Sequence, residues 1–311
     1  MNKILITPRS LTKNGHPALN RLEDAGYNLT FSNPGVQPTE EELQRLLPDC
    51  IGMLAGVEPI TAKVLEAAEQ LKVISRNGVG VNNIDKEAAE TKGIKILITP
   101  GANSFGVAEL AFGHILSVTR SIPFCDAAIK RSDWQRKKGV ELKGKVLGIV
   151  GCGSIGRYVT QLALGFNMQV LAYDPFADKS FHPSEKFKYC SFDELVGRAD
   201  IISLHCPANE DGSALIDDKV ISKMKAGVYI VNTARAELLD EDAVLRALDC
   251  GKIAGLALDV FSPEPPEDWR LAKHENVVAT AHIGGFTRES VDRSVGMAVD
   301  NLISALKSEG D

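Results

Sequence analysis

Strand-like and helix-like stretches alternate along most of this chain, and that alternation limits the folds that it can adopt. The clearest helical pattern covers residues 61–69, where Val64, Leu65 and Ala68 follow a capping residue, Thr61. Strict alternation predicts a parallel sheet with helices on both faces. The strand candidates in this first part of the chain are residues 3–7, 27–32, 51–57, 72–76 and 95–99.

The alternation is interrupted once. Residues 99–104 contain adjacent proline and glycine, which favour a turn, and residues 107–119 have the composition of an apolar helix. A second alternation begins at the apolar run 145–150, and residues 288–306 are again helical. The last helix is therefore expected to return to the first part of the chain.

The length of the chain indicates two domains, because 311 residues exceed the size at which one hydrophobic core usually stops growing. We expect two doubly wound parallel-sheet domains, an α/β fold. One comprises residues 102–285, and the other comprises residues 1–101 together with residues 286–311.

Charge and cysteine content exclude several classes of protein. A net charge of −6 gives no overall field to attract nucleic acid or a membrane surface. No apolar run approaches the roughly 20 residues that span a bilayer. The six cysteines show neither a C-x-x-C pair nor a metal-ligand spacing. We therefore expect a cytoplasmic protein without nucleic-acid or membrane partners and without a metal.

A glycine-rich loop opens the second alternation. Gly151, Gly153 and Gly156 follow a wholly apolar strand and precede a helical pattern, which is the context that a dinucleotide-binding loop requires. The first glycine permits the turn, the second lets the backbone approach a pyrophosphate, and the third lets helix and strand pack closely. The free N–H groups of the helix then face the anion.

The next predicted strand ends at Asp174, about 20 residues after the loop, where such folds place the acid that bonds the adenosine ribose. A strand-end turn formed by Asp174 and Pro175 is an alternative, and both can hold at once. A carboxylate would repel a 2′-phosphate, and no arginine adjoins it in the sequence. We therefore expect NAD rather than NADP.

Arg235 follows the buried-type strand 228–232, at the edge where open α/β sheets bind ligands. Its planar donor fork could hold a carboxylate and a carbonyl oxygen. An ion pair with Glu237 or Asp240 on the surface is the alternative.

Two further residues suit acid–base chemistry. Glu264 lies in a proline-rich loop after the strand that ends at Asp259, and His282 follows another strand and precedes two glycines. A glutamate beside this imidazole would stabilise the imidazolium, which could give a proton to a carbonyl. A solvated loop acid and a structural histidine are the alternatives, and His205 is a competing histidine without a comparable acid.

These motifs together resemble the D-2-hydroxyacid dehydrogenase family, and they are most similar to its D-3-phosphoglycerate dehydrogenase branch. The resemblance covers nearly the whole chain. The matching stretches are residues 76–85, 99–109, 151–156, 232–235, 258–261, 264–265 and 282–285.

The resemblance implies a Rossmann NAD-binding domain inserted in a flavodoxin-like substrate domain, and a homodimer formed through the cofactor domain. It implies hydride transfer between the nicotinamide and a small D-2-hydroxy acid. Arg235 would bind the substrate, His282 would exchange the proton, and Glu264 would tune His282.

The resemblance also implies the binding residues. Asp259 would contact the nicotinamide amide, and backbone N–H groups of residues 77–80 would bind the substrate carboxylate. The cofactor set is Gly151, Gly153, Ser154, Ile155, Gly156, Asp174, Cys206, Pro207, Thr233, Ala234, Asp259, His282 and Gly284. The substrate set is Arg76, Asn77, Gly78, Val79, Gly80, Arg235 and His282.

The chain departs from the family pattern at Ala236, where glycine is usual, and at Asn82, where aspartate is usual. The first departure puts the local backbone shape and the choice of substrate in question. Because the chain ends at Asp311, we expect a short form without the regulatory domains of long phosphoglycerate dehydrogenases.

The expected substrate is 3-phosphoglycerate-like. The basic loop 134–138, across a dimer interface, and Arg76 are candidates to meet a phosphate, and a solvated basic loop is the alternative. Other 2-oxo acids such as glyoxylate or hydroxypyruvate remain alternatives. An NAD-sensing, corepressor-like binding protein is an alternative of another class. A formate or phosphite dehydrogenase is disfavoured, since related formate enzymes pair the histidine with glutamine rather than with an acid such as Glu264.

Overall fold

The computed structural model describes residues 2–307, and the chain divides into two compact units. Unit one comprises Met1–Asn103 and Arg288–Asp311, and unit two comprises Ser104–Thr287. The unit boundaries lie two residues after the predicted ones, which are residues 101 and 285.

Unit one is built on a sheet of five parallel strands in the order β2-β1-β3-β4-β5. This order is that of flavodoxin-like folds, as expected. The strands are β1 (Lys3–Ile6), β2 (Asn28–Phe31), β3 (Cys50–Ala55), β4 (Val73–Arg76) and β5 (Lys95–Leu97).

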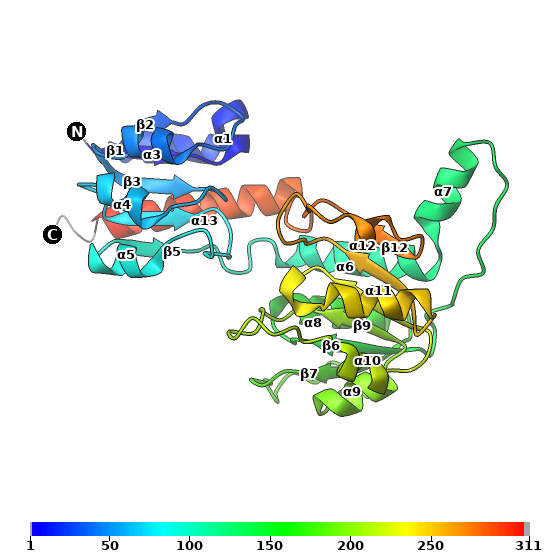
Figure 1. Cartoon of the computed structure of the whole chain (residues 1–311). Helices are drawn as coiled ribbons and strands as arrows, with labels where there is room; N and C mark the ends of the chain where they lie inside the picture. Colours follow the sequence, from blue (N-terminus) through cyan, green and yellow to red (C-terminus); the bar gives the residue numbers. More distant parts are fainter. Residues whose placement is uncertain (1, 308–311) are drawn as a thin grey trace. The chain divides into compact units, whose positions relative to one another are not determined.

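Helices cover both faces of this sheet. Figure 1 shows α13, the long orange and red helix, lying along the strands of unit one, and its side chains share a core with β1, β3 and β4. The helices of unit one are α1 (Arg9–Asn14), η1 (Pro17–Leu19), α2 (Asn20–Asp24), α3 (Glu40–Leu46), α4 (Ala62–Ala67), α5 (Lys86–Thr91) and α13 (Arg288–Lys307).

Unit two contains a sheet of seven parallel strands in the order β12-β11-β10-β9-β6-β7-β8. After β6 the chain adds β7 and β8 on one side of that strand, and it then adds β9 to β12 on the other side. The topological switch point therefore lies between β6 and β9. The strands are β6 (Val146–Val150), β7 (Gln169–Tyr173), β8 (Phe187–Tyr189), β9 (Ile201–Leu204), β10 (Val228–Asn232), β11 (Ile253–Leu258) and β12 (Val277–Ala279).

The helices of unit two pack on both faces of its sheet, and α6 and α8 lie side by side in one of its two cores. Figure 1 shows α7 and the loop after it standing away from that sheet. The helices are α6 (Ser104–Thr119), α7 (Ile122–Lys130), α8 (Ser154–Gly165), α9 (Phe192–Arg198), α10 (Asp218–Lys223), η2 (Ala236–Leu238), α11 (Glu241–Asp249) and α12 (Arg270–Lys273).

The elements differ from the expectations mainly at their ends. The hydroxyl of Thr61 accepts from Val64 N, as a capping residue should, but α4 stops at Ala67 because Ala68 leaves the helical region with ψ 77°. Helix α6 begins at Ser104, three residues before the predicted start. The sequence analysis missed α7, whose first turn contains Pro123; proline is compatible with that position.

Burial of α13 on the sheet generates a stability prediction. Leu302 is fully buried among β-strand side chains of unit one, so Leu302→Ala should lower the free energy of unfolding by about 2–5 kcal/mol. Urea unfolding followed by circular dichroism measures the change. Ser304→Ala, at an exposed position of the same helix, is the control. An unchanged urea midpoint for Leu302→Ala would show that α13 does not stabilise this core.

Candidate active site

The glycine loop follows β6 at the switch point of unit two. Gly151 has φ +91°, and a Cβ placed there would lie 2.6 Å from His205 O, so only glycine fits. A Cβ on Gly156 would lie 2.2 Å from Gly151 O. A Cβ on Gly153 would meet nothing within 4 Å, and no side chain caps the start of α8 there. The loop therefore leaves open space beside uncapped helix N–H groups, which fits a pyrophosphate.

Asp174 follows β7 and reaches the glycine loop. Its Oδ2 accepts from Cys152 N at 2.8 Å, and its Oδ1 accepts from Phe176 N at 2.8 Å. The second bond is the strand-end turn that the sequence suggested. Each oxygen keeps a lone pair, and these can accept from ribose hydroxyls.

Arg157 is a residue of this region that the sequence analysis missed. From the first turn of α8 its guanidinium donates to Cys152 O at 3.3 Å and to Asp178 at 3.0 Å, and it lies over the ring of Phe181. Its place directly after Gly156 was the available signal. Arg157 ties the loop to the segment after β7.

Two residues directly after β9, His205 and Cys206, are uncharged near neutral pH. His205 Nε2 lies 2.9 Å from Ser203 Oγ, and burial lowers the pKa of His205 to about 3. This histidine therefore stays uncharged and does not compete with His282 as a proton donor. Burial also raises the pKa of the Cys206 thiol to about 11, so it stays protonated near neutral pH.

Buried Asn232 shapes the turn after β10. Its Oδ1 accepts from Ala234 N at 3.0 Å and its Nδ2 donates to Arg235 O at 2.7 Å. The guanidinium of Arg235 donates to Ala234 O at 2.7 Å and forms no ion pair with any residue of the described chain. Asp240, one alternative partner, caps α11 instead. Most donors of Arg235 therefore remain open to an anionic ligand.

Ala236 does not strain the backbone. It opens the short helix η2, is 9% exposed, and has no positive φ. The departure from the usual glycine therefore leaves the turn that carries Arg235 in an ordinary conformation.

Orphaned polar atoms lie at the ends of β9 and β10. Within residues 2–307, His205 Nδ1 and Thr233 Oγ1 are buried without a hydrogen-bond partner. Such atoms are rare in folded proteins and fit a site that a polar ligand completes. Cys206, Pro207, Thr233 and Ala234 belong to this edge of the sheet.

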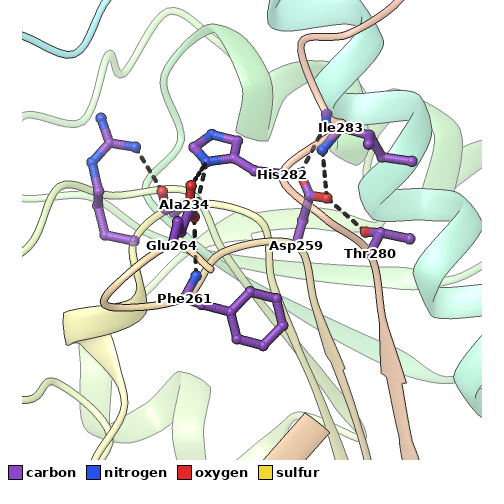
Figure 2. A network of polar contacts seen from close by, with 9 residues as sticks. Ala234, Asp259, Phe261, Glu264, Thr280, His282 and Ile283 are labelled. Carbon is purple, nitrogen blue, oxygen red and sulfur yellow. Dashed lines mark hydrogen bonds and ion pairs between the residues drawn. The ribbon is translucent and has the colours of Figure 1, made fainter. Parts of the chain in front are cut away.

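Glu264 and His282 meet. Nδ1 of His282 lies 2.9 Å from Oε1 and 2.8 Å from Oε2 of Glu264, and Oε1 also accepts from Phe261 N at 3.1 Å. Figure 2 shows dashed lines joining a ring nitrogen of His282 to this carboxylate. Because a carboxylate only accepts, Nδ1 carries the proton of this bond, and Nε2 is left to exchange a proton with a ligand.

Asp259, at the end of β11, is 1% exposed and holds the segment that follows β12. Ile283 N and Thr280 Oγ1 donate to its Oδ1 at 2.8 and 2.6 Å, and Gly284 N donates to its Oδ2 at 2.8 Å. A Cβ on Gly284 would lie 3.0 Å from that Oδ2, so glycine allows the close approach. Oδ2 keeps one lone pair for a further donor.

In unit one, residues 77–80 form a loop after β4. Gly78 has φ +146°, and Asn77 Oδ1 is buried without a partner among the described residues. The guanidinium of Arg76 donates to Gly80 O at 3.0 Å and to Asn77 O, so Arg76 clamps this loop.

The basic loop 134–138 lies at the other end of the unit-two sheet from His282. Lys137 donates to Glu275 and Asn276, directly before β12, each at 3.1 Å, whereas His282 comes after β12. Trp134 is 81% exposed. Within one chain this loop therefore does not line the site around His282.

Residues 2–307 contain no group of acidic, cysteine and histidine side chains able to hold a metal ion. In the same residues no helix combines the length and apolarity needed to cross a membrane.

A dinucleotide loop at a switch point and a Glu–His pair on neighbouring strand ends define a nucleotide-dependent class of α/β protein with an acid–base site. Residues 112–284 match the family described as D-isomer specific 2-hydroxyacid dehydrogenase, NAD binding domain. The chain belongs to this family, and the predictions of family and cofactor are confirmed.

Relatives carry several names. D-3-phosphoglycerate dehydrogenase of Homo sapiens is 42% identical over 258 residues, covering 82% of this chain and 48% of that protein. The chain thus spans about half the length of this relative. Hydroxypyruvate reductase of Thermotoga maritima is 42% identical over 264 residues, covering 83% of this chain and 85% of that protein.

Solved structures show the same fold, which confirms the predicted fold class. A glyoxylate reductase from Paecilomyes thermophila has a TM-score of 0.87 at 30% identity, covering 99% of this chain and 96% of that one. D-Lactate dehydrogenase from Aquifex aeolicus, complexed with NAD and lactic acid, has a TM-score of 0.81 at 29% identity, covering 99% and 96%.

The packing at Gly156 generates a binding prediction. Gly156→Ala places a methyl group against Gly151 O and should weaken NADH binding at least about tenfold, because helix and loop must separate. Titration of NADH fluorescence measures the dissociation constant. Gly165→Ala, at the end of the same helix with free space around its Cβ, should bind normally. Equal affinities for the two variants would contradict the proposed loop.

Proposed function

We propose that the protein is an NAD-dependent dehydrogenase of small D-2-hydroxy acids, and that unit two is its cofactor domain and unit one its substrate domain. The paired Glu264 and His282, on the same sheet edge as Arg235 and the glycine loop, carry this proposal. Bound NAD supplies the hydride acceptor, or NADH the donor. The residues of the chain supply charge, orientation and proton exchange.

His282 is the proposed acid–base residue. With Glu264 accepting from Nδ1, Nε2 takes the hydroxyl proton as the substrate is oxidised, and returns it to the carbonyl oxygen in the reverse direction. Glu264 holds the ring and stabilises the imidazolium that forms.

Arg235 is the proposed substrate-binding cation. One of its N–H groups donates to Ala234 O, and the others are left to bind the carboxylate and carbonyl oxygens. Backbone N–H groups of the loop 77–80 are proposed to bind the substrate carboxylate; those of Val79 and Gly80 are the candidates, because Asn77 N and Gly78 N already donate to backbone carbonyls. The remaining lone pair on Asp259 Oδ2 is proposed to accept from the nicotinamide amide.

The proposed substrate is 3-phosphoglycerate-like, with hydroxypyruvate and glyoxylate as alternatives. Relatives named for both kinds of reaction support this range. The loop containing Arg136 contacts residues directly before β12, whereas His282 follows β12. This loop could therefore contact the phosphate of a substrate only in the site of a partner subunit.

We propose a homodimer that uses α7 and the loop after it, because large apolar side chains are exposed there. Ile122, Ile129 and Trp134 are 51%, 53% and 81% exposed.

All six cysteines are free, which fits a reducing compartment such as the proposed cytoplasm.

A substrate panel tests the proposed function. The absorbance of NADH should fall in the presence of 3-phosphohydroxypyruvate, hydroxypyruvate, glyoxylate or pyruvate. A preference for the phosphorylated acid that disappears in Arg136→Ala would support the phosphoglycerate-like substrate. Tight binding of NADH without turnover of any of these acids would instead favour an NAD-sensing binding protein.

The role of His282 has its own prediction. His282→Asn should lower kcat with the best substrate by about 10²–10⁴, because the carbonyl loses its proton donor. Steady-state assays measure this loss, and His182→Asn, at an exposed histidine in the same unit, should retain full activity. A turnover of His282→Asn within threefold of the parent, about 0.7 kcal/mol, would remove His282 from the mechanism.

A further inference from the structure

The backbone at His282 is in an unusual conformation. Its φ is +49°, in the left-handed region that disfavours side chains other than glycine. The two N–H groups that follow it, those of Ile283 and Gly284, both donate to the Asp259 carboxylate at 2.8 Å. This buried carboxylate therefore fixes the chain directly after His282.

Thr280 holds the carboxylate in turn. Its hydroxyl oxygen lies 2.6 Å from Asp259 Oδ1 and 3.4 Å from Leu258 O. The shorter contact, to a charged acceptor, takes the single hydroxyl proton. The oxygen of Thr280 then offers only lone pairs to any further neighbour.

That further neighbour is His114, which comes from α6. Its Nε2 lies 3.0 Å from Thr280 Oγ1, so the imidazole must donate to the hydroxyl. His114 is 3% exposed, and burial lowers its pKa although the charge of Asp259 opposes the shift. A neutral His114 with its proton on Nε2 satisfies the geometry.

We propose that His114 and Thr280 are positioning residues for His282. His114 donates to Thr280, and Thr280 donates to Asp259. Asp259 in turn accepts from Ile283 N and Gly284 N. Figure 2 shows the part of this network from Thr280 to Ile283. The set holds His282 in its left-handed conformation, with Nδ1 against Glu264. The inference rests on the proposed role of His282 and adds an orienting role to Asp259.

Substitutions at position 280 test the proposal. Thr280→Val keeps the shape but removes the hydroxyl, so kcat should fall by about 10- to 100-fold, the size expected for a misplaced catalytic group. The dissociation constant of NADH should change less than about threefold, because the glycine loop holds most of the cofactor. Thr280→Ser, which retains the hydroxyl, should restore kcat.

A second measurement does not depend on catalysis. In the cofactor-free protein, hydrogen exchange of the Ile283 and Gly284 amides, followed by nuclear magnetic resonance, should be at least about tenfold faster in Thr280→Val. Thr119→Val removes another buried hydroxyl, on α6, and should change neither exchange nor kcat. If the parent turned over no 2-oxo acid, the proposed function would fail while the exchange rates still tested the positioning.

Variants of His114 provide an independent arm. His114→Gln can keep an N–H donor toward Thr280 and should stay within about threefold of the parent, whereas His114→Leu should behave like Thr280→Val. If Thr280→Val does not fold, the His114 variants still test whether these residues position His282. Unchanged kcat and amide exchange in His114→Leu or Thr280→Val, or a loss confined to NADH binding, would overturn the proposal.

Discussion

The parallel arrangement of the unit-two strands is the constraint on which the candidate site depends. Helices cover both faces of a parallel sheet, so ligands bind in the crevice outside the carboxyl ends of the strands. Because all seven strands are parallel, those ends share one edge. The glycine loop, Arg235 and Asp259 each follow a different strand and still belong to one edge, although they are far apart in the sequence.

Features set by local chemistry could be predicted from the sequence. Gly156 makes a close approach to Gly151 O, a neighbour a few residues away, and the positive φ of Gly151 belongs to the local turn, although the close contact of Gly151 is with His205 O on another strand end. The alternation of apolar runs and helical spacing gave the two sheets for the same reason. The pairing of Glu264 with His282 was expected because each follows a strand, but it also required the family resemblance, since nothing local links them.

Features set by packing could not be predicted. In the sequence, His114 is one residue within an apolar helix, and nothing local links it to Thr280. The contact arises because α6 packs against β12. The position of Arg157 directly after Gly156 placed it beside the glycine loop, but its contacts with Cys152 O and Asp178 depend on how α8 packs. The extent of α7 was missed because proline usually ends helices, and only its place in the first turn makes it compatible.

The buried part of the site fixes the backbone of His282, and the exposed part holds the acid–base group. A non-glycine residue in the left-handed region costs about 1–3 kcal/mol and persists only where surrounding structure fixes it. At His282 that fixation comes from the buried side, where the Asp259 carboxylate accepts from three donors of the chain. The imidazole itself is half exposed and forms hydrogen bonds only with Glu264 among the described residues, so Nε2 can exchange protons while the backbone of His282 is held in place. A buried anchor with an exposed acid–base group is the arrangement that lets a loop residue act with the precision of a core residue.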